Sequence, residues 1–475
     1  VPVGLLCWPL AAALHSLTWT AFSWWLTPLL GSLTAVLMAI GLRAAAGPVR
    51  PEIAPNDRTA RSRRPTTSGW STMGVPVATL AAAAVLTAVS SATGAFVFTA
   101  DSWGGYASTA MRLADTGVLF ERIMSERAAI IPAMSAGYRA FGGEWLFTIY
   151  PLIALSVLAI LAMAVLRRNR GITTAGAALF GSMAAVIGLA AHPFFLFHSI
   201  YIHSHMLTAL YVLLGVVAVA LASEDAEPAW LSVAGLAAAG IVLSRPDGLA
   251  YAVIPLISAG VIALRDSRDP GHSVVATYAP HLAVNLVVFG AAIVRDGLWA
   301  SPKLSGRMAV ALLALHAALG VAFWLISRQK RARDVSARHG LTIALGLAVI
   351  AAMGVAVIAE QTPDTARIML GNLLTDGEWG LLWYAVPGIL VISAMVSIRH
   401  HKDMLLVLGG WTVPMFLAAA WAVHASAHPG HLGWTDSFNR VAFHVVPVVF
   451  LCVGAIIAWT IHVLMQPVDG KVGRR

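Results

Sequence analysis

Runs of about 20 apolar residues recur along nearly the whole chain of 475 residues, separated by short polar stretches. A helix of ~20 apolar residues crosses the ~30 Å hydrocarbon core of a bilayer. We therefore predict an all-α protein, a polytopic transmembrane helix bundle of about 14 spans. The expected spans are 3–19, 22–43, 75–98, 146–166, 172–190, 204–222, 229–243, 249–264, 274–294, 307–327, 341–359, 380–398, 404–423 and 441–464.

The composition strengthens this prediction, since 59% of the residues are hydrophobic, 11% are charged and the mean hydropathy is +0.79. No stretch remains for a sizeable water-soluble domain. Cys7 and Cys452 both lie in apolar runs, which excludes a disulfide framework and a cysteine-based metal site. The net charge of +9 comes mainly from arginine in loops, and such charge orients a membrane protein. We therefore expect membrane lipids as neighbours and no nucleic acid partner.

The distribution of basic residues predicts the orientation. Alternate threading places 21 of the 31 lysines and arginines on one side, which the positive-inside rule makes cytoplasmic. They lie in segments 43–64, 167–170, 265–268, 328–338, 399–402 and 471–475. We expect a multi-pass protein of the plasma (inner) membrane, with both termini in the cytoplasm and the unusual polar loops on the extracytoplasmic face.

The same pattern divides the chain into four parts. Residues 1–43 form two additional N-terminal spans, and 44–74 form a basic cytoplasmic linker, because that segment is rich in Pro, Ser, Thr and Arg. Residues 75–465 form the main transmembrane bundle, and 466–475 form a cytoplasmic tail. The N-terminus lacks a basic region followed by a cleavage site, so we expect no removable signal peptide.

The outer loop "TADSWGGYASTAMRLADTGVLF" (99–120) begins with an aspartate directly after a span. Tyr106, Ala110 and Leu113 recur at helical spacing, and Gly117 is a suitable stop, so a short interfacial helix is expected on the outer face. Asp101 is either a helix N-cap or interfacial charge, or a general base that accepts a proton from a hydroxyl group.

Two later segments place charge between apolar runs. In "SRPDG" (244–248), Pro246 and Gly248 break the helix beside Arg245 and Asp247, which either pair locally or let the arginine bind a phosphate. Arg440, in "SFNR", begins the last span and either extends to lipid headgroups or binds a phosphate as well.

Three histidines, His198, His203 and His205, cover about two turns if they lie on one helix. A zinc site requires one or two further ligands, so hydrogen bonding to sugar or phosphate and a plain interfacial role stay open alternatives. Tryptophans near the outer span ends suit an aromatic belt or stacking on sugar rings: Trp103, Trp145, Trp299, Trp379 and Trp434.

Taken together, these motifs resemble the GT-C superfamily of membrane glycosyltransferases, which use polyprenyl-phosphate-linked sugars. The similar segments, in order, are "DSWGGYASTAMRLADTG", "FFLFHSIYIHSHMLTALYVLLG", "AGIVLSRPDGLAYAVIPL" and "SFNRVAFHVVPVVFL". In most relatives the catalytic loop follows the first span, whereas here it follows the third, so the first two spans look like an addition. The Ala, Arg and Trp usage is actinobacterial-looking.

The resemblance implies a sugar transfer from a polyprenyl-phosphate donor to an acceptor hydroxyl on a glycan, lipid or protein. Asp101 is then the catalytic base of a single inverting displacement, and Arg245 and Arg440 are phosphate ligands. Further substrate contacts are expected from Asp247, His198, His203, His205 and Tyr106. A divalent cation (Mg²⁺ or Mn²⁺) stays open, with carboxylates in reserve at Asp115, Glu121, Glu126, Asp364, Asp376, Glu378 and Asp436. The alternative functions are a secondary transporter and a lipid-linked glycan polymerase or ligase.

Overall fold

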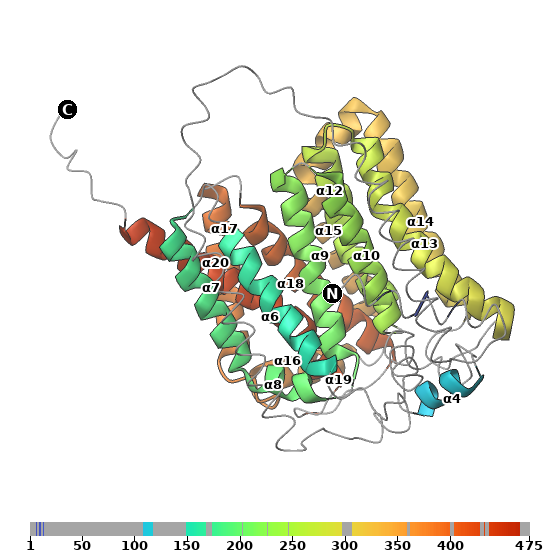
Figure 1. Cartoon of the computed structure of the whole chain (residues 1–475), viewed down its shortest axis with the longest axis horizontal. Coiled ribbons are helices and arrows are strands. Elements are labelled where there is room, and N and C mark those ends of the chain that lie inside the picture. Colours follow the sequence, from blue (N-terminus) through green and yellow to red (C-terminus); the bar gives the residue numbers. More distant parts are fainter. Residues whose placement is uncertain are drawn as a thin grey trace.

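The structure is a computed structural model, and it describes residues 6, 9–10, 13, 108–116, 149–167, 173–201, 203–225, 227–245, 247–296, 306–358, 362–399, 403–427, 432 and 437–465. Helices dominate this part of the chain, and it contains no β-strand (Figure 1). The long helices are α6 (Ile149–Arg167), α7 (Ala175–Ala190), α9 (His205–Asp225), α10 (Pro228–Ser244), α12 (Val253–Asp266), α13 (Pro270–Asp296), α14 (Gly306–Arg328), α15 (Lys330–Ile358), α17 (Leu382–Arg399), α18 (Met404–Ala427) and α20 (Val446–Met465).

Shorter helices lie between them: α4 (Ser108–Thr116), α8 (Pro193–Ile200), α11 (Gly248–Tyr251), α16 (Thr362–Leu374), α19 (Ser437–Ala442) and the 3₁₀ turn η5 (Phe443–Val445). The predicted all-α polytopic bundle is confirmed. Each of the 11 spans expected between residues 146 and 464 coincides with a helix. Among the described residues, six helices are long and apolar enough to cross a membrane, or seven if the bent pair α7 and α8 is one span.

The spans expected before residue 98 lie almost entirely outside the described residues, so the domain divisions stay predictions. A helix is present at the predicted place as α4, where Ala110 and Leu113 are buried, and its position at the membrane interface stays a prediction. It ends at Thr116, directly before Gly117. In Figure 1, α4 lies at the same end of the molecule as α8, α16 and α19.

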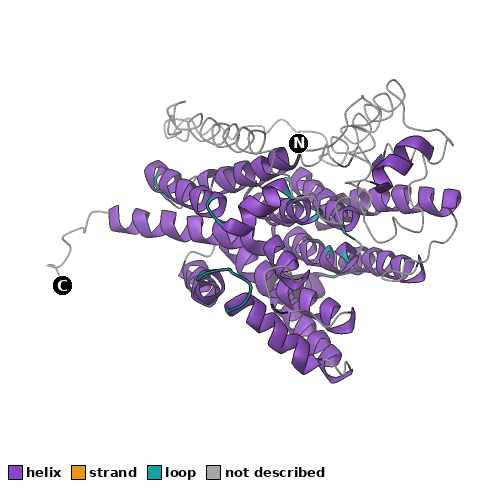
Figure 2. Cartoon of the chain, turned by 90° about the horizontal axis from the view of Figure 1, so that it is seen from below, coloured by secondary structure: helices purple, strands orange, loops and turns teal. Residues whose placement is uncertain are grey.

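Helix α9 is the centre of the bundle, and it packs against α6, α10, α12, α18 and α20. It is apolar all round, which is the pattern of a helix buried on every side, and 89% of its apolar window is buried. The apolar window of α14 is only 22% buried, and side chains such as Val321 and Leu325 point outward. Seen from below in Figure 2, the helices form several packed rows. Because most of the apolar window of α14 is not covered by other helices, its outward apolar side chains are suited to face lipid.

Helices α7 and α20 approach each other through glycines. A Cβ added at Gly181 would meet the Gly454 carbonyl oxygen and lie 2.8 Å from the Ala458 Cβ. Small residues allow the close backbone contact that holds helices together in lipid, where no hydrophobic force favours association. The pair fixes the last span against α7, which leads into the site.

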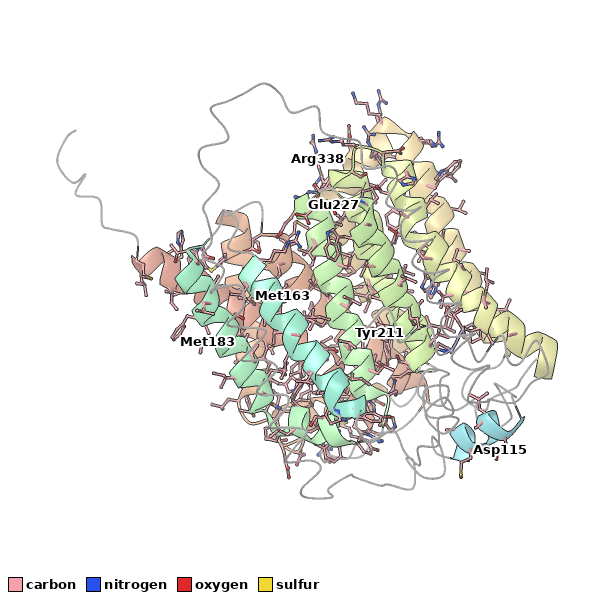
Figure 3. The ribbon with its side chains drawn as sticks, in the orientation of Figure 1. Asp115, Met163, Met183, Tyr211, Glu227 and Arg338 are labelled. Carbon is pink, nitrogen blue, oxygen red and sulfur yellow. The ribbon has the colours of Figure 1, made fainter. Side chains whose placement is uncertain are left out.

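Charged side chains join several helix ends at one end of the bundle. Arg167 forms an ion pair with Asp225 and its guanidinium lies 5.6 Å from the Trp230 ring, and Ser223 donates a hydrogen bond of 2.5 Å to Asp266. The C-terminal ends of α6, α9 and α12 are therefore together, as the alternating topology requires. In Figure 3, Glu227 and Arg338 lie at this end and Asp115 lies at the other. That the charged end faces the cytoplasm stays a prediction.

One span boundary is different from the prediction. Helix α15 begins at Lys330, not near residue 341, and only Gln329 separates it from α14. Hydropathy detects only the part of a helix that lies in lipid. Lys, Arg and Ala are good helix formers, so a helix rich in them can begin before the apolar segment. The basic run that was expected to be a loop is therefore the first turns of a helix that extends beyond the apolar segment.

Candidate functional site

The end of the bundle opposite the charged end is built from helix breaks. Helices α7 and α8 meet at an angle of 70°, α10 gives way to the single turn α11, and α19 and η5 precede α20. At the first break, Pro193 is at the start of α8, and the His192 side chain accepts a 3.3 Å hydrogen bond from the Phe194 N–H. Breaks of this kind bring polar side chains to the ends of otherwise apolar helices.

The break between α10 and α11 holds Arg245 and Asp247. Arg245 has an extended backbone and donates two parallel hydrogen bonds to the Asp247 carboxylate, Nε to Oδ1 at 2.7 Å and Nη2 to Oδ2 at 3.0 Å. The two side chains are only 14% and 18% exposed. The local pair that the sequence offered as one alternative is therefore formed. It leaves Nη1 of Arg245 pointing elsewhere, toward His205.

The three predicted histidines do come together, but not on one helix. Helix α8 ends at Ile200, the chain turns, and α9 begins at His205. The expectation of two continuous helical turns is wrong, because Tyr201, His203 and Ser204 between the two helices are not helical. The His203 and His205 rings are stacked at 4.1 Å with 9° between their planes, and the His198 and His205 rings lie 5.2 Å apart.

His205 links this cluster to the arginine. Arg245 Nη1 lies 3.1 Å from His205 Nδ1. A guanidinium group only donates hydrogen bonds, and its Nη1 also lies 3.5 Å from His205 Nε2, so we assign the acceptor to the closer Nδ1 and the proton of the neutral imidazole to Nε2. A permanent positive charge at this distance also favours the neutral imidazole. The ring can therefore donate a hydrogen bond to an anion without being charged itself.

A fourth histidine, His444, was missed by the sequence reasoning. It lies in η5, is completely buried, and its Nε2 is 2.9 Å from His205 Nδ1. His444 follows Arg440 by four residues, which is the spacing of one helical face, so this signal was available in "NRVAFH". Only the packing of η5 against α9 shows that His444 belongs with His205.

Arg440 approaches the cluster from α19. Its Nη1 donates to the Tyr201 hydroxyl at 3.4 Å, and the Tyr201 ring is stacked on His203 at 5.3 Å. Continuous contacts thus run from Arg440 through Tyr201, His203 and His205 to Arg245. Two arginines and one aspartate give this cluster a net charge of +1 when the histidines are neutral. That charge and the inward-facing N–H groups are suited to an anion.

His198 has an unusual environment. Its side chain is 1% exposed, it lies 4.4 Å from the Phe443 ring, and neither ring nitrogen has a hydrogen-bond partner among the described residues. A buried polar group without a partner costs roughly 1–3 kcal/mol. His198 therefore brings two ring nitrogens without a partner among the described residues next to His205.

Trp379 lies in the turn between α16 and α17. It is stacked on Phe194 at 3.9 Å and donates from Nε1 to the Asn439 Oδ1 at 2.8 Å. Glu378 and Gly380 on either side have positive φ angles of 57° and 58°. With only 4% of its surface exposed, Trp379 packs inside the described part of the bundle, and its role in an aromatic belt or in stacking on sugar rings stays a prediction.

The remaining site predictions lie largely outside the described residues. These are Asp101, Tyr106, Glu121, Glu126, Asp436, Trp103, Trp145, Trp299 and Trp434. Asp115 on α4 and Asp364 on α16 are exposed, and Asp376 accepts a 2.6 Å hydrogen bond from Thr375. Within the described part of the chain, no group of three or more His, Cys, Asp or Glu residues could hold a metal ion. The roles of all these residues, and a divalent cation, stay predictions.

Comparison with known proteins gives a likeness to solved structures. No protein family model and no curated protein matches the chain. It is similar to the archaeal oligosaccharyltransferase AglB from Archaeoglobus fulgidus in complex with an inhibitory peptide and a dolichol-phosphate. The two chains are 15% identical, the TM-score is 0.46, and the match covers 79% of this chain and 50% of the AglB chain. The oligosaccharyltransferase from the same organism in complex with Zn and sulfate gives 16% identity and a TM-score of 0.48 over 80% and 49%. The chain thus spans about half the length of these structures, and a likeness at this level says nothing about individual site residues.

Proposed function

We propose that this chain is a membrane glycosyltransferase of the GT-C type, which moves a sugar from a polyprenyl-phosphate donor to an acceptor hydroxyl on the extracytoplasmic face. The observation that carries the proposal is a buried cluster in which His205 contacts Arg245, His444 and His198. Arg440 is joined to this cluster through Tyr201 and His203. It lies at the end of the bundle away from the basic helix ends, where the sequence predicts the outer face. Sugars on lipid phosphates are a donor that can be flipped to that face.

In the proposed reaction, the acceptor oxygen forms a bond to the anomeric carbon while the bond from that carbon to the phosphate oxygen breaks. The acceptor proton passes to the Asp101 carboxylate, and the lipid phosphate leaves as the anion. A single displacement of this kind inverts the anomeric configuration. Because the leaving group is already a stable anion, the site has to stabilise charge and needs no strong general acid.

The described residues are suited to that task. Arg245 keeps Asp247 as its counter-ion on one edge and directs Nη1 toward His205. The Nε2–H of His205 and either nitrogen of His198 supply neutral donors, which hold a phosphate without placing further cations in a low-dielectric region. The sugar and the acceptor, whether glycan, lipid or protein, are left open by this proposal. A lipid-linked glycan polymerase or ligase would share the same donor chemistry.

A secondary transporter is the second candidate function, and one observation favours it. His281 on α13 and His316 on α14 are completely buried in spans and their ring nitrogens lie 2.9 Å apart. Ionisable groups inside a membrane often belong to proton pathways. The arginines that the sequence singled out lie at one end of the bundle, which favours the transferase.

The deciding experiment uses the purified full chain in liposomes. It offers a panel of radiolabelled polyprenyl-phosphate pentoses and hexoses with lipid and glycan acceptors, with and without EDTA. The proposal expects a labelled product and free polyprenyl phosphate in equal amounts, and the EDTA arm reports any need for a divalent cation. Gradient-dependent uptake of a solute without consumption of any lipid donor would identify a transporter instead.

A further inference from the structure

Among the buried polar side chains of the membrane-spanning helices, three with nitrogen donors form a group apart from the cluster described above. His281 and Asn285 are on α13 and His316 is on α14, and each is 0% exposed. Placing such groups among apolar helices is costly, so their hydrogen bonds are expected to have a purpose.

These side chains form an ordered chain of hydrogen bonds. His316 Nε2 lies 2.9 Å from the Leu249 carbonyl oxygen, and His316 Nδ1 lies 2.9 Å from His281 Nε2. A carbonyl only accepts, so Nε2 of His316 donates, and the neutral ring then accepts at Nδ1 from His281. Asn285 donates to the His281 carbonyl at 2.8 Å, one turn back along α13.

The chain of hydrogen bonds ends on the helix break of the site. Leu249 belongs to α11, which has only four residues, and Asp247 is its N-cap. The turn is the first part of a helical segment that continues into α12 after Ala252, and its first N–H group, that of Gly248, donates to the Arg245 carbonyl. The Asp247 side chain does not cap the backbone of α11. The bond from His316 adds a long-range attachment of α11 to α14, and α11 also packs against α10, α14 and α18.

We infer that His316, supported by His281, is a positioning residue for the phosphate site. By holding the Leu249 carbonyl it fixes α11, and with it the Asp247 carboxylate that orients Arg245 toward His205. This inference rests on the proposed function for its catalytic consequence. The attachment of α11 itself can be measured without any activity.

The test compares two amide replacements that have the same chemistry but a different reach. In His316→Gln the side chain can still donate to Leu249, whereas in His316→Asn it is one methylene shorter and cannot. His339→Gln, at an exposed position on α15, is the control. Hydrogen–deuterium exchange of the peptide covering 245–256 and steady-state transfer kinetics are measured for each variant and for the wild type in the same lipid.

The expected result is faster exchange in His316→Asn, by about ten-fold for the α11 amides, the effect of one lost hydrogen bond. Its kcat for transfer falls by a similar factor while the KM for the acceptor is unchanged, and His316→Gln restores both values. Equal exchange and equal kcat in the Asn variant and the wild type would overturn the inference. If the wild type transfers no sugar from any lipid phosphate, the proposed function fails, and the exchange comparison still decides whether His316 holds α11.

Discussion

Replacing Gly248 by alanine is the sharpest test of the helix break. A Cβ at this position would meet the Ile241 carbonyl oxygen and would lie 2.8 Å from Ile241 C and 3.0 Å from Val242 Cα. All three atoms are backbone, so no side chain can rotate away. Ordinary contact begins near 3.4 Å, so Ile241 C alone requires a separation of about 0.6 Å between α11 and α10, and the closer Ile241 carbonyl oxygen requires more.

Such a displacement has two measurable effects. Overpacking of this kind costs about 1–3 kcal/mol of stability, which lowers the thermal unfolding midpoint in detergent. It also moves Asp247, at the start of α11, and thereby Arg245. Because a misplacement of ~1 Å can cost ~100-fold in rate, transfer from the lipid donor should fall by at least about ten-fold.

The matched control is Gly388→Ala on α17, where an added Cβ would meet no atom within 4 Å. Alanine is preferred to glycine in a helix interior by about 1 kcal/mol, so this variant should unfold at an equal or higher temperature and keep full activity. Wild-type turnover in Gly248→Ala, together with an unchanged unfolding midpoint, would refute the claim that this close backbone contact sets the geometry of the site.

Three further outcomes are expected. Arg245→Lys should lower the rate of sugar transfer by about 100-fold, because lysine cannot bond Asp247 twice and also face His205. The control Arg328→Lys, at the opposite end of the bundle, should leave the amount of labelled product unchanged. Asp101→Asn should abolish transfer at unchanged protein level in membranes, and full activity in this variant removes Asp101 from the mechanism. Trp379→Phe should keep the stack on Phe194 but lose the bond to Asn439, which lowers stability by about 1 kcal/mol in thermal unfolding; an unchanged unfolding midpoint would contradict this role.

The fold was largely predictable because a bilayer leaves few choices. Backbone groups in lipid have to be bonded internally, so each long apolar run in the described part is a helix, and alternation of arginine-rich ends gives their relative direction. The error at α15 has the same origin, since hydropathy is blind to helix that continues into water. The start of that helix at Lys330 depends on helix propensity instead.

The site was predictable only in part. Arg245 and Asp247 stood out because charge beside a helix break in an apolar sequence is rare, and their pairing followed from their separation of two residues. Their neighbour His205 is 40 residues away, and His444 is 239 residues from His205. No local pattern encodes such contacts.

The sequence by itself determined that this is an all-α membrane protein and where its helices run. It also determined which polar residues are unusual among apolar helices, because hydropathy and helix breaking act over a few neighbouring residues. The tertiary structure decided which of those residues meet. It placed His205 between Arg245 and His444, turned Trp379 inward and joined His316 to α11. These arrangements depend on how whole helices pack, and packing is set by side-chain shapes summed over the entire bundle.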